Sequence, residues 1–255
     1  MSWTGIITAL VTPFARDGGS VDIGRFRQLV TRQAAAGVSG IVIGGTTGEG
    51  PTLSQAEKRA LVSAAAAEAG DHMHIIAGIS GNDTQAVQDM VRDFAATGAI
   101  DGIMATCPYY NKPSQAGLKA HMQAVTAAAG DMPVLIYNVP GRVGVNMTPD
   151  TVAALAGADA EIAGIKEASG DYNQIAELAR RFEGTDFRVL AGDDSMAFPV
   201  MTLGGAGVVS VLANALPHRM QDMSISLQRG DMATARRHYL QLLPLMRASF
   251  LGGNP

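Results

Sequence analysis

Short apolar runs alternate with longer Ala-rich segments along the chain, and this alternation restricts the fold more than any other feature. The runs are rich in Val, Ile and small residues, which is typical of strands buried on both faces of a parallel sheet. Eight of them occur, at 5–11, 39–44, 74–79, 101–106, 133–138, 162–166, 187–191 and 206–211. A strand followed by a helix, repeated eight times, predicts a parallel (β/α)8 barrel (a TIM barrel) of the α/β class, with an open doubly wound sheet as the alternative.

The segments between the runs open with helix start signals. Ser54 and Glu57 have the spacing of a capping box before an Ala-rich stretch. Ser114 precedes another such stretch, and Thr148 followed by Pro149 supplies a cap and a first turn. These signals support helices between the strands.

A ninth helical pattern spans 232–250, beyond the eighth strand-helix unit. No linker or low-complexity segment separates it from the rest of the 255 residues, and 47% of the chain is hydrophobic. We therefore expect one barrel over 1–230, followed by a C-terminal helical extension over 231–255.

Charge and cysteine content point to a small-molecule partner. The net charge is -4 and no run of Lys or Arg occurs, so nothing favours binding to nucleic acid or to an anionic membrane. The apolar stretches are interrupted well before the roughly 20 residues of a membrane span. Cys107 is the single cysteine, and the start MSWTGIITAL lacks the pattern of a signal peptide. A cytoplasmic location is expected.

In a barrel of this kind, the reacting groups lie at the carboxyl ends of the strands and in the loops that follow them. Reading off those positions gives hydroxyls, phenols, one arginine and one lysine, at Thr46, Thr47, Tyr109, Tyr110, Tyr137, Arg142 and Lys166, with Gly192 after the seventh strand. The five histidines fall elsewhere, so a metal centre is not expected. Cys107 is a rival nucleophile, but no histidine base is indicated near it.

Lys166 stands inside an apolar run that reads as a buried strand. A buried ammonium group is costly unless it is paired or loses its proton, so this lysine is either compensated or reactive. A compensated lysine would pack its stem in the barrel and pair with Glu167 or Asp193. A reactive one would need an uncharged amine near neutral pH, which burial favours.

Five motifs link these positions in order and with consistent spacing: GGTTGEG at 44–50, PYYNKPS at 108–114, YNVPGRVG at 137–144, GIKEASGD at 164–171 and AGDDSMAFPVMTLGGAGVVSV at 191–211. Across these motifs the chain resembles the dihydrodipicolinate synthase and N-acetylneuraminate lyase family of pyruvate-dependent class I aldolases. The resemblance extends from residue 4 onward and implies a barrel with Schiff-base chemistry.

The resemblance also implies roles for the catalytic residues. Lys166 would form an imine with the keto carbon of pyruvate. Tyr137 would relay protons during imine formation, helped by Thr46 and Tyr110, because collapse of the carbinolamine requires a proton donor within hydrogen-bond reach. The family pattern implies that Tyr110 reaches into the site of a neighbouring subunit, so a homodimer or homotetramer is expected.

Four further residues are expected to bind substrate. Thr47 belongs to a loop whose backbone N–H groups suit the carboxylate of pyruvate, and Gly192 and Val209 match positions in the family motifs. Arg142 matches the arginine with which the synthases of the family hold the carboxylate of aspartate semialdehyde. The synthases commonly carry Thr after this arginine, whereas this chain has Val143.

The expected reaction is therefore the condensation of pyruvate with L-aspartate 4-semialdehyde, with neither a metal nor an organic cofactor, because the lysine imine is the electron sink. A 2-keto-3-deoxy-sugar-acid or 4-hydroxy-2-oxo-acid aldolase using the same imine is the first alternative. A noncatalytic barrel that binds an oxo-acid is the second.

Two departures from the family pattern lead to further expectations. Lysine inhibits many bacterial synthases through a histidine and a glutamate, which correspond here to Lys58 and Ala86, so feedback by lysine should be weak or absent. Family members continue beyond the segment matching FLGGNP with further helices, so the extension is expected to be short and oligomer assembly to be affected.

Overall fold

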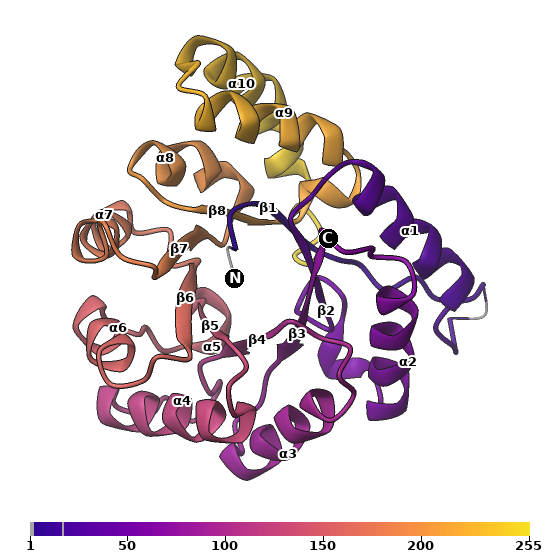
Figure 1. Cartoon of the computed structure of the whole chain (residues 1–255), viewed down its shortest axis with the longest axis vertical. Helices are drawn as coiled ribbons and strands as arrows, with labels where there is room; N and C mark the ends of the chain where they lie inside the picture. Colours follow the sequence, from indigo (N-terminus) through magenta and orange to yellow (C-terminus); the bar gives the residue numbers. More distant parts are fainter. Residues whose placement is uncertain (1–2, 17) are drawn as a thin grey trace.

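The computed structural model describes residues 3–16 and 18–255, and its centre is a closed barrel of eight parallel strands in sequence order (Figure 1). The strands are β1 (Gly5–Ala9), β2 (Gly40–Ile43), β3 (His74–Ile79), β4 (Gly102–Thr106), β5 (Val134–Asn138), β6 (Ile162–Glu167), β7 (Arg188–Ala191) and β8 (Gly207–Ser210). Pairing of β1 with both β2 and β8 closes the ring. The (β/α)8 prediction is confirmed, and the open doubly wound sheet is excluded.

Helices form the outer layer around the strands in Figure 1. They are α1 (Ile23–Ala35), α2 (Gln55–Ala66), α3 (Thr84–Ala95), α4 (Gln115–Ala129), α5 (Pro140–Val143), α6 (Pro149–Ala156), α7 (Tyr172–Arg181), α8 (Ala197–Thr202), α9 (Pro217–Gln228) and α10 (Met232–Ala248). Ser54 and Glu57 form the predicted capping box at the start of α2. Ser114 and Thr148 cap α4 and α6 through their side chains, also as predicted.

The register between neighbouring strands decides which side chains meet. Lys166 of β6 pairs with Tyr137 of β5, and Glu167 pairs with Asn138 one residue further along. Successive side chains of a strand point to opposite faces of the sheet. The first pair therefore faces the barrel interior, and the second pair faces the helical layer.

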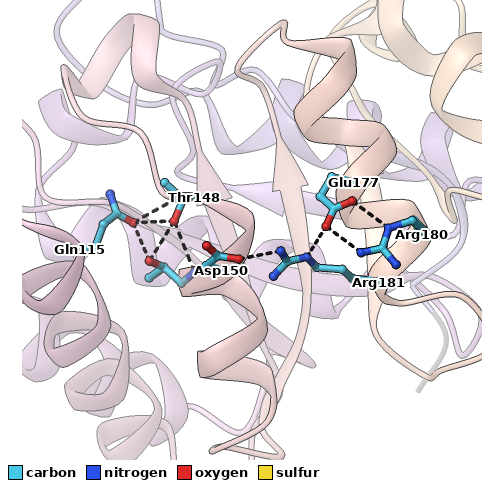
Figure 2. A network of polar contacts seen from close by, with 7 residues as sticks. Gln115, Thr148, Asp150, Glu177, Arg180 and Arg181 are labelled. Carbon is cyan, nitrogen blue, oxygen red and sulfur yellow. Dashed lines mark hydrogen bonds and ion pairs between the residues drawn. The ribbon is translucent and has the colours of Figure 1, made fainter.

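Polar contacts hold the helices outside β5 and β6 in place (Figure 2). The side-chain oxygen of Gln115, at the start of α4, accepts hydrogen bonds from the backbone N–H of Thr148 at 3.1 Å and from the hydroxyl of Thr151 at 2.6 Å. Asp150 of α6 pairs with Arg181 of α7 at 2.6 Å. Such exposed ion pairs contribute little individually, so the orientation of α6 depends mainly on its capped start and its apolar face.

Helix α10 packs along α9, and its side chains reach back to the barrel. Leu242 and Met246 belong to the same apolar core as the strands. The Tyr239 hydroxyl donates a hydrogen bond to the carbonyl of Ser195, at 2.8 Å. We retain the division into a barrel over 1–230 and an extension over 231–255 as a proposal. Across the described residues, no helix is both long and apolar enough to cross a bilayer.

Candidate active site

A cavity of about 220 Å³ lies at the carboxyl ends of the barrel strands. Its lining comes from strands β5 and β6, from the segments that follow β2, β5, β6, β7 and β8, and from the segment after α10. It comprises Thr46, Thr47, Tyr137, Val139, Arg142, Lys166, Ala168, Gly192, Asp193, Val211 and Phe250. The barrel thus brings together six residues proposed from the sequence to form the site: the two threonines, the tyrosine, the arginine, the lysine and the glycine.

Lys166 and Tyr137 are in direct contact in this cavity. The Lys166 side chain is almost fully buried, at 5% exposure, and its Nζ lies 3.9 Å from the centroid of the Tyr137 ring. Both side chains come from strands rather than loops, so the paired register of β5 and β6 fixes their separation. The amine is held where a ketone in the cavity can reach it.

The two carboxylates that could compensate Lys166 bind other groups. Glu167 points to the opposite face of β6, where the backbone N–H of Ser169 donates to it at 2.6 Å. Asp193 accepts hydrogen bonds from the backbone and the hydroxyl of Ser195, both at 2.7 Å. In the part of the chain that the structure describes, Lys166 takes part in no ion pair. The arrangement therefore favours a reactive lysine over a compensated one.

Behind the site, Glu167 is 1% exposed, and its carboxylate is held by amide groups. Asn138 donates to it at 2.9 Å and Gln174 of α7 at 3.0 Å. Asn146, in the loop after α5, accepts hydrogen bonds from both amides, at 2.8 and 3.1 Å. Because each of these groups is hydrogen-bonded, a charge buried here is tolerated. The network joins both catalytic strands to the loop that follows Arg142.

Two residues proposed from the sequence lie outside the cavity. Tyr110 is 86% exposed and has a backbone φ of 69°, which is unusual for a residue other than glycine. Val209 is fully buried in β8, where it pairs with Ile7, and Val211 lines the cavity two residues further on. Neither Tyr110 nor Val209 can therefore be assigned a contact with a bound substrate in a single chain.

The segment after α10 covers part of the site, and this covering segment was not predicted as part of the site. Phe250 lines the cavity. Arg142 donates a hydrogen bond from Nη2 to the carbonyl of Gly253, at 3.2 Å, and Asn254 donates to the carbonyl of Thr46, at 3.3 Å. The only sequence signal for these contacts was the match of FLGGNP to the family, which gives no position in space. The guanidinium of Arg142 keeps further donors for a ligand.

Cys107, the rival nucleophile, has an environment that disfavours its reactive thiolate form. Burial, together with the nearby charge of Glu167, raises the pKa of the Cys107 thiol to about 12. The thiol therefore stays protonated at neutral pH and is a poor nucleophile, which agrees with the sequence argument.

Val143 is 6% exposed and does not line the cavity, so the lack of a hydroxyl at this position leaves the cavity wall unchanged.

The family model described as "Dihydrodipicolinate synthetase family" matches residues 2–255. The 4-hydroxy-tetrahydrodipicolinate synthase of Nitratidesulfovibrio vulgaris is 43% identical over 255 residues, covering 100% of this chain and 86% of that protein. The enzyme of the same name from Salinibacter ruber is 44% identical over 256 residues, covering 100% and 83%.

Solved structures of dihydrodipicolinate synthases are also similar to this chain, over 99% of its length. A dihydrodipicolinate synthase from Cyanidioschyzon merolae with lysine bound has a TM-score of 0.94 at 38% identity, covering 99% of this chain and 85% of that one. A structure described as the first monomeric dihydrodipicolinate synthase variant has a TM-score of 0.95 at 35% identity, covering 99% and 83%.

Gly192 gives a steric test of the site. A Cβ at this position would lie 2.5 Å from the Cβ of Ala168 and 3.0 Å from the carbonyl oxygen of Glu167, so the ends of β6 and β7 would have to separate. We expect Gly192→Ala to destabilise the protein by about 1–3 kcal/mol and to slow reaction at Lys166. Urea unfolding and activity assays measure the two effects.

Gly24→Ala is the matched control, because the nearest atom to its added Cβ is 3.4 Å away, an ordinary contact in α1. Equal stability of the two variants would contradict the proposed crowding at Gly192.

Proposed function

The chain belongs to the dihydrodipicolinate synthetase family, and from this premise we propose that its barrel condenses pyruvate with L-aspartate 4-semialdehyde to give 4-hydroxy-tetrahydrodipicolinate. The chain is thus a Schiff-base-forming lyase of the class I aldolase type, acting in lysine and diaminopimelate biosynthesis. The observation that carries the proposal is the buried amine of Lys166 beside Tyr137, in a cavity that also contains Arg142.

In the proposed reaction, the uncharged amine of Lys166 attacks the keto carbon of pyruvate. The resulting carbinolamine loses water when Tyr137 donates a proton to its hydroxyl group, which leaves a protonated imine. Loss of a methyl proton gives an enamine, and its carbon attacks the aldehyde. The amine of the semialdehyde then attacks the imine carbon, closes the ring and expels Lys166. The chemistry requires no metal or organic cofactor.

The other lining residues have binding roles in this proposal. Thr46 supplies a hydroxyl to the cavity that Tyr137 also lines, and Thr47 and Gly192 line the same cavity as the lysine. Arg142 carries the charge that suits the second carboxylate, that of the semialdehyde. Val209 supports the cavity from the core of the barrel, because it lies two residues before Val211.

We retain a homodimer or homotetramer as part of the proposal. The support is the exposed Tyr110, since a large aromatic side chain at 86% exposure offers a contact for a second copy of the chain. One similar solved structure is described as a monomeric variant, so the oligomeric state must be measured in solution. A cytoplasmic location, supported by the lone Cys107, is likewise a proposal.

Trapping with borohydride tests the imine. Incubation with pyruvate and borohydride should add the reduced pyruvate adduct to Lys166, detectable by mass spectrometry of the peptide, and Lys166→Met should abolish the addition. A folded wild-type protein that is not modified would support the noncatalytic oxo-acid-binding barrel instead.

Arg142 tests the identity of the aldehyde. Arg142→Lys replaces a guanidinium that can bind a carboxylate bidentately with a single ammonium group. The KM for the semialdehyde should therefore rise by about 10- to 100-fold. The rate of pyruvate trapping should stay unchanged, because the variant does not alter Lys166. Faster turnover of sugar aldehydes than of the semialdehyde by the wild-type enzyme would favour the 2-keto-3-deoxy-sugar-acid aldolase.

Lysine feedback should be weak or absent. Lys58 lies on α2, partly buried, and Ala86 lies exposed on α3, so the pair offers a lysine ligand a like charge and no carboxylate. Activity measured against increasing L-lysine should stay constant through the physiological range. Tight inhibition there would refute the prediction, and loss of that inhibition in Lys58→Ala would place the inhibitor at this position.

A further inference from the structure

Thr106, the last residue of β4, occupies the same row of the barrel as the catalytic pair. It pairs with Tyr137 of β5, which in turn pairs with Lys166 of β6. Neighbouring residues across a parallel ladder project to the same face of the sheet. A lysine, a phenol and a hydroxyl therefore stand side by side on three adjacent strands.

The hydroxyl of Thr106 is buried without a partner. The residue is 8% exposed, and its Oγ1 makes no hydrogen bond to any described residue. Leaving a buried polar group unsatisfied costs free energy, so such a group calls for a specific explanation. Val in this place would have filled the same volume without that cost.

Thr106 lines a small cavity of about 10 Å³. Its lining includes four residues with hydroxyl groups, namely Thr46, Ser80, Thr106 and Tyr137. The volume is near the lower limit of about 10–15 Å³ that one water molecule needs. These four residues carry enough hydroxyl groups to supply the two to four polar partners that hold a buried water in place.

We propose that Thr106 and one water molecule in this cavity form a proton relay to Tyr137, an inference that rests on the proposed function. When the carbinolamine on Lys166 collapses, its C–O bond breaks, the C=N bond forms, and Tyr137 protonates the departing hydroxide to give water. The phenolate takes a proton from the cavity water, which is held between Thr106 and Tyr137 by a hydrogen bond to the threonine hydroxyl. That water is in turn reprotonated from solvent. The net result is the uptake of one solvent proton, with each relay group unchanged.

This relay lies within one chain. Tyr110, the relay partner implied by the family pattern, is 86% exposed in the single chain and does not line either cavity. Thr46 lines both cavities, so it connects the relay to the space where substrate binds. Proton supply to Tyr137 therefore does not have to wait for a second subunit.

Thr106→Val tests the relay with a side chain of the same shape. The rate of imine formation, followed by timed borohydride trapping with pyruvate, should fall by about 10- to 100-fold. The pyruvate concentration for half-maximal trapping should not change. The midpoint of thermal unfolding should change little, because the hydroxyl makes no hydrogen bond to another residue that the substitution would break. Thr106→Ser should restore the rate to within about threefold of wild type.

Thr8→Val is the matched control, since Thr8 is also buried at a strand position but donates to Gln33 at 2.8 Å. It should lower the unfolding midpoint and leave the trapping rate unchanged. The solvent isotope effect adds a readout that packing does not affect. The dependence of the rate on the D2O fraction should be curved for wild type, because several protons move, and linear for Thr106→Val.

A wild-type trapping rate in Thr106→Val would overturn the relay, and so would failure of Thr106→Ser to restore a lost rate. If the valine variant does not fold, Thr106→Ala removes the same hydroxyl and is judged by the same criteria. Absence of trapping in wild-type protein itself would instead contradict the proposed Schiff-base function, so the two failures are distinguishable.

Discussion

The register of the central strands is the constraint on which the site depends. Because β4, β5 and β6 pair in parallel, Thr106, Tyr137 and Lys166 fall in one row, and none of them can move along its strand without breaking the ladder. A shift of one residue would turn each side chain to the opposite face. The closed barrel removes the free edges at which such a shift could begin, and the amine therefore meets the phenol at a fixed separation.

The next residues of β5 and β6 reinforce this register from outside the barrel. Asn138 and Glu167 carry their hydrogen bond on the face that packs against the helices, one residue beyond the catalytic pair. Asn146 ties the same network to the loop after α5, and Gln115 holds that loop from α4 by donating to the Asn146 carbonyl at 2.8 Å. The polar contacts of Figure 2 therefore continue inward to the back of the active site. Positioning groups and reacting groups occupy opposite faces of the same two strands.

The sequence predicted the parts of this design that have a local or periodic signal. The strand-helix alternation predicted the barrel, the cap residues predicted helix starts, and a lysine in an apolar run indicated Lys166. The covering segment at Phe250 and the unsatisfied hydroxyl of Thr106 could not be predicted in this way. Phe250 is the last residue of the ninth helical pattern, and its place over the cavity results from how α10 packs on α9. In the sequence, nothing distinguishes Thr106 from other threonines at the ends of strands. Only the pairing of β4 with β5 places it beside Tyr137.

The acidic groups near the site all accept hydrogen bonds from other groups, and of Glu167, Asp193 and Asp194 only Asp193 lines the cavity. Glu167 is held by amides, and Asp193 accepts from Ser195. Asp194, whose pKa is raised by burial, accepts from the backbone N–H groups of Val211 and Leu212 and does not line the cavity. A carboxylate free beside Lys166 would stabilise its ammonium form and so oppose attack on a ketone. Hydroxyl groups carry protons without adding a charge, so a site that must keep its amine uncharged is better served by threonine and tyrosine than by an acid.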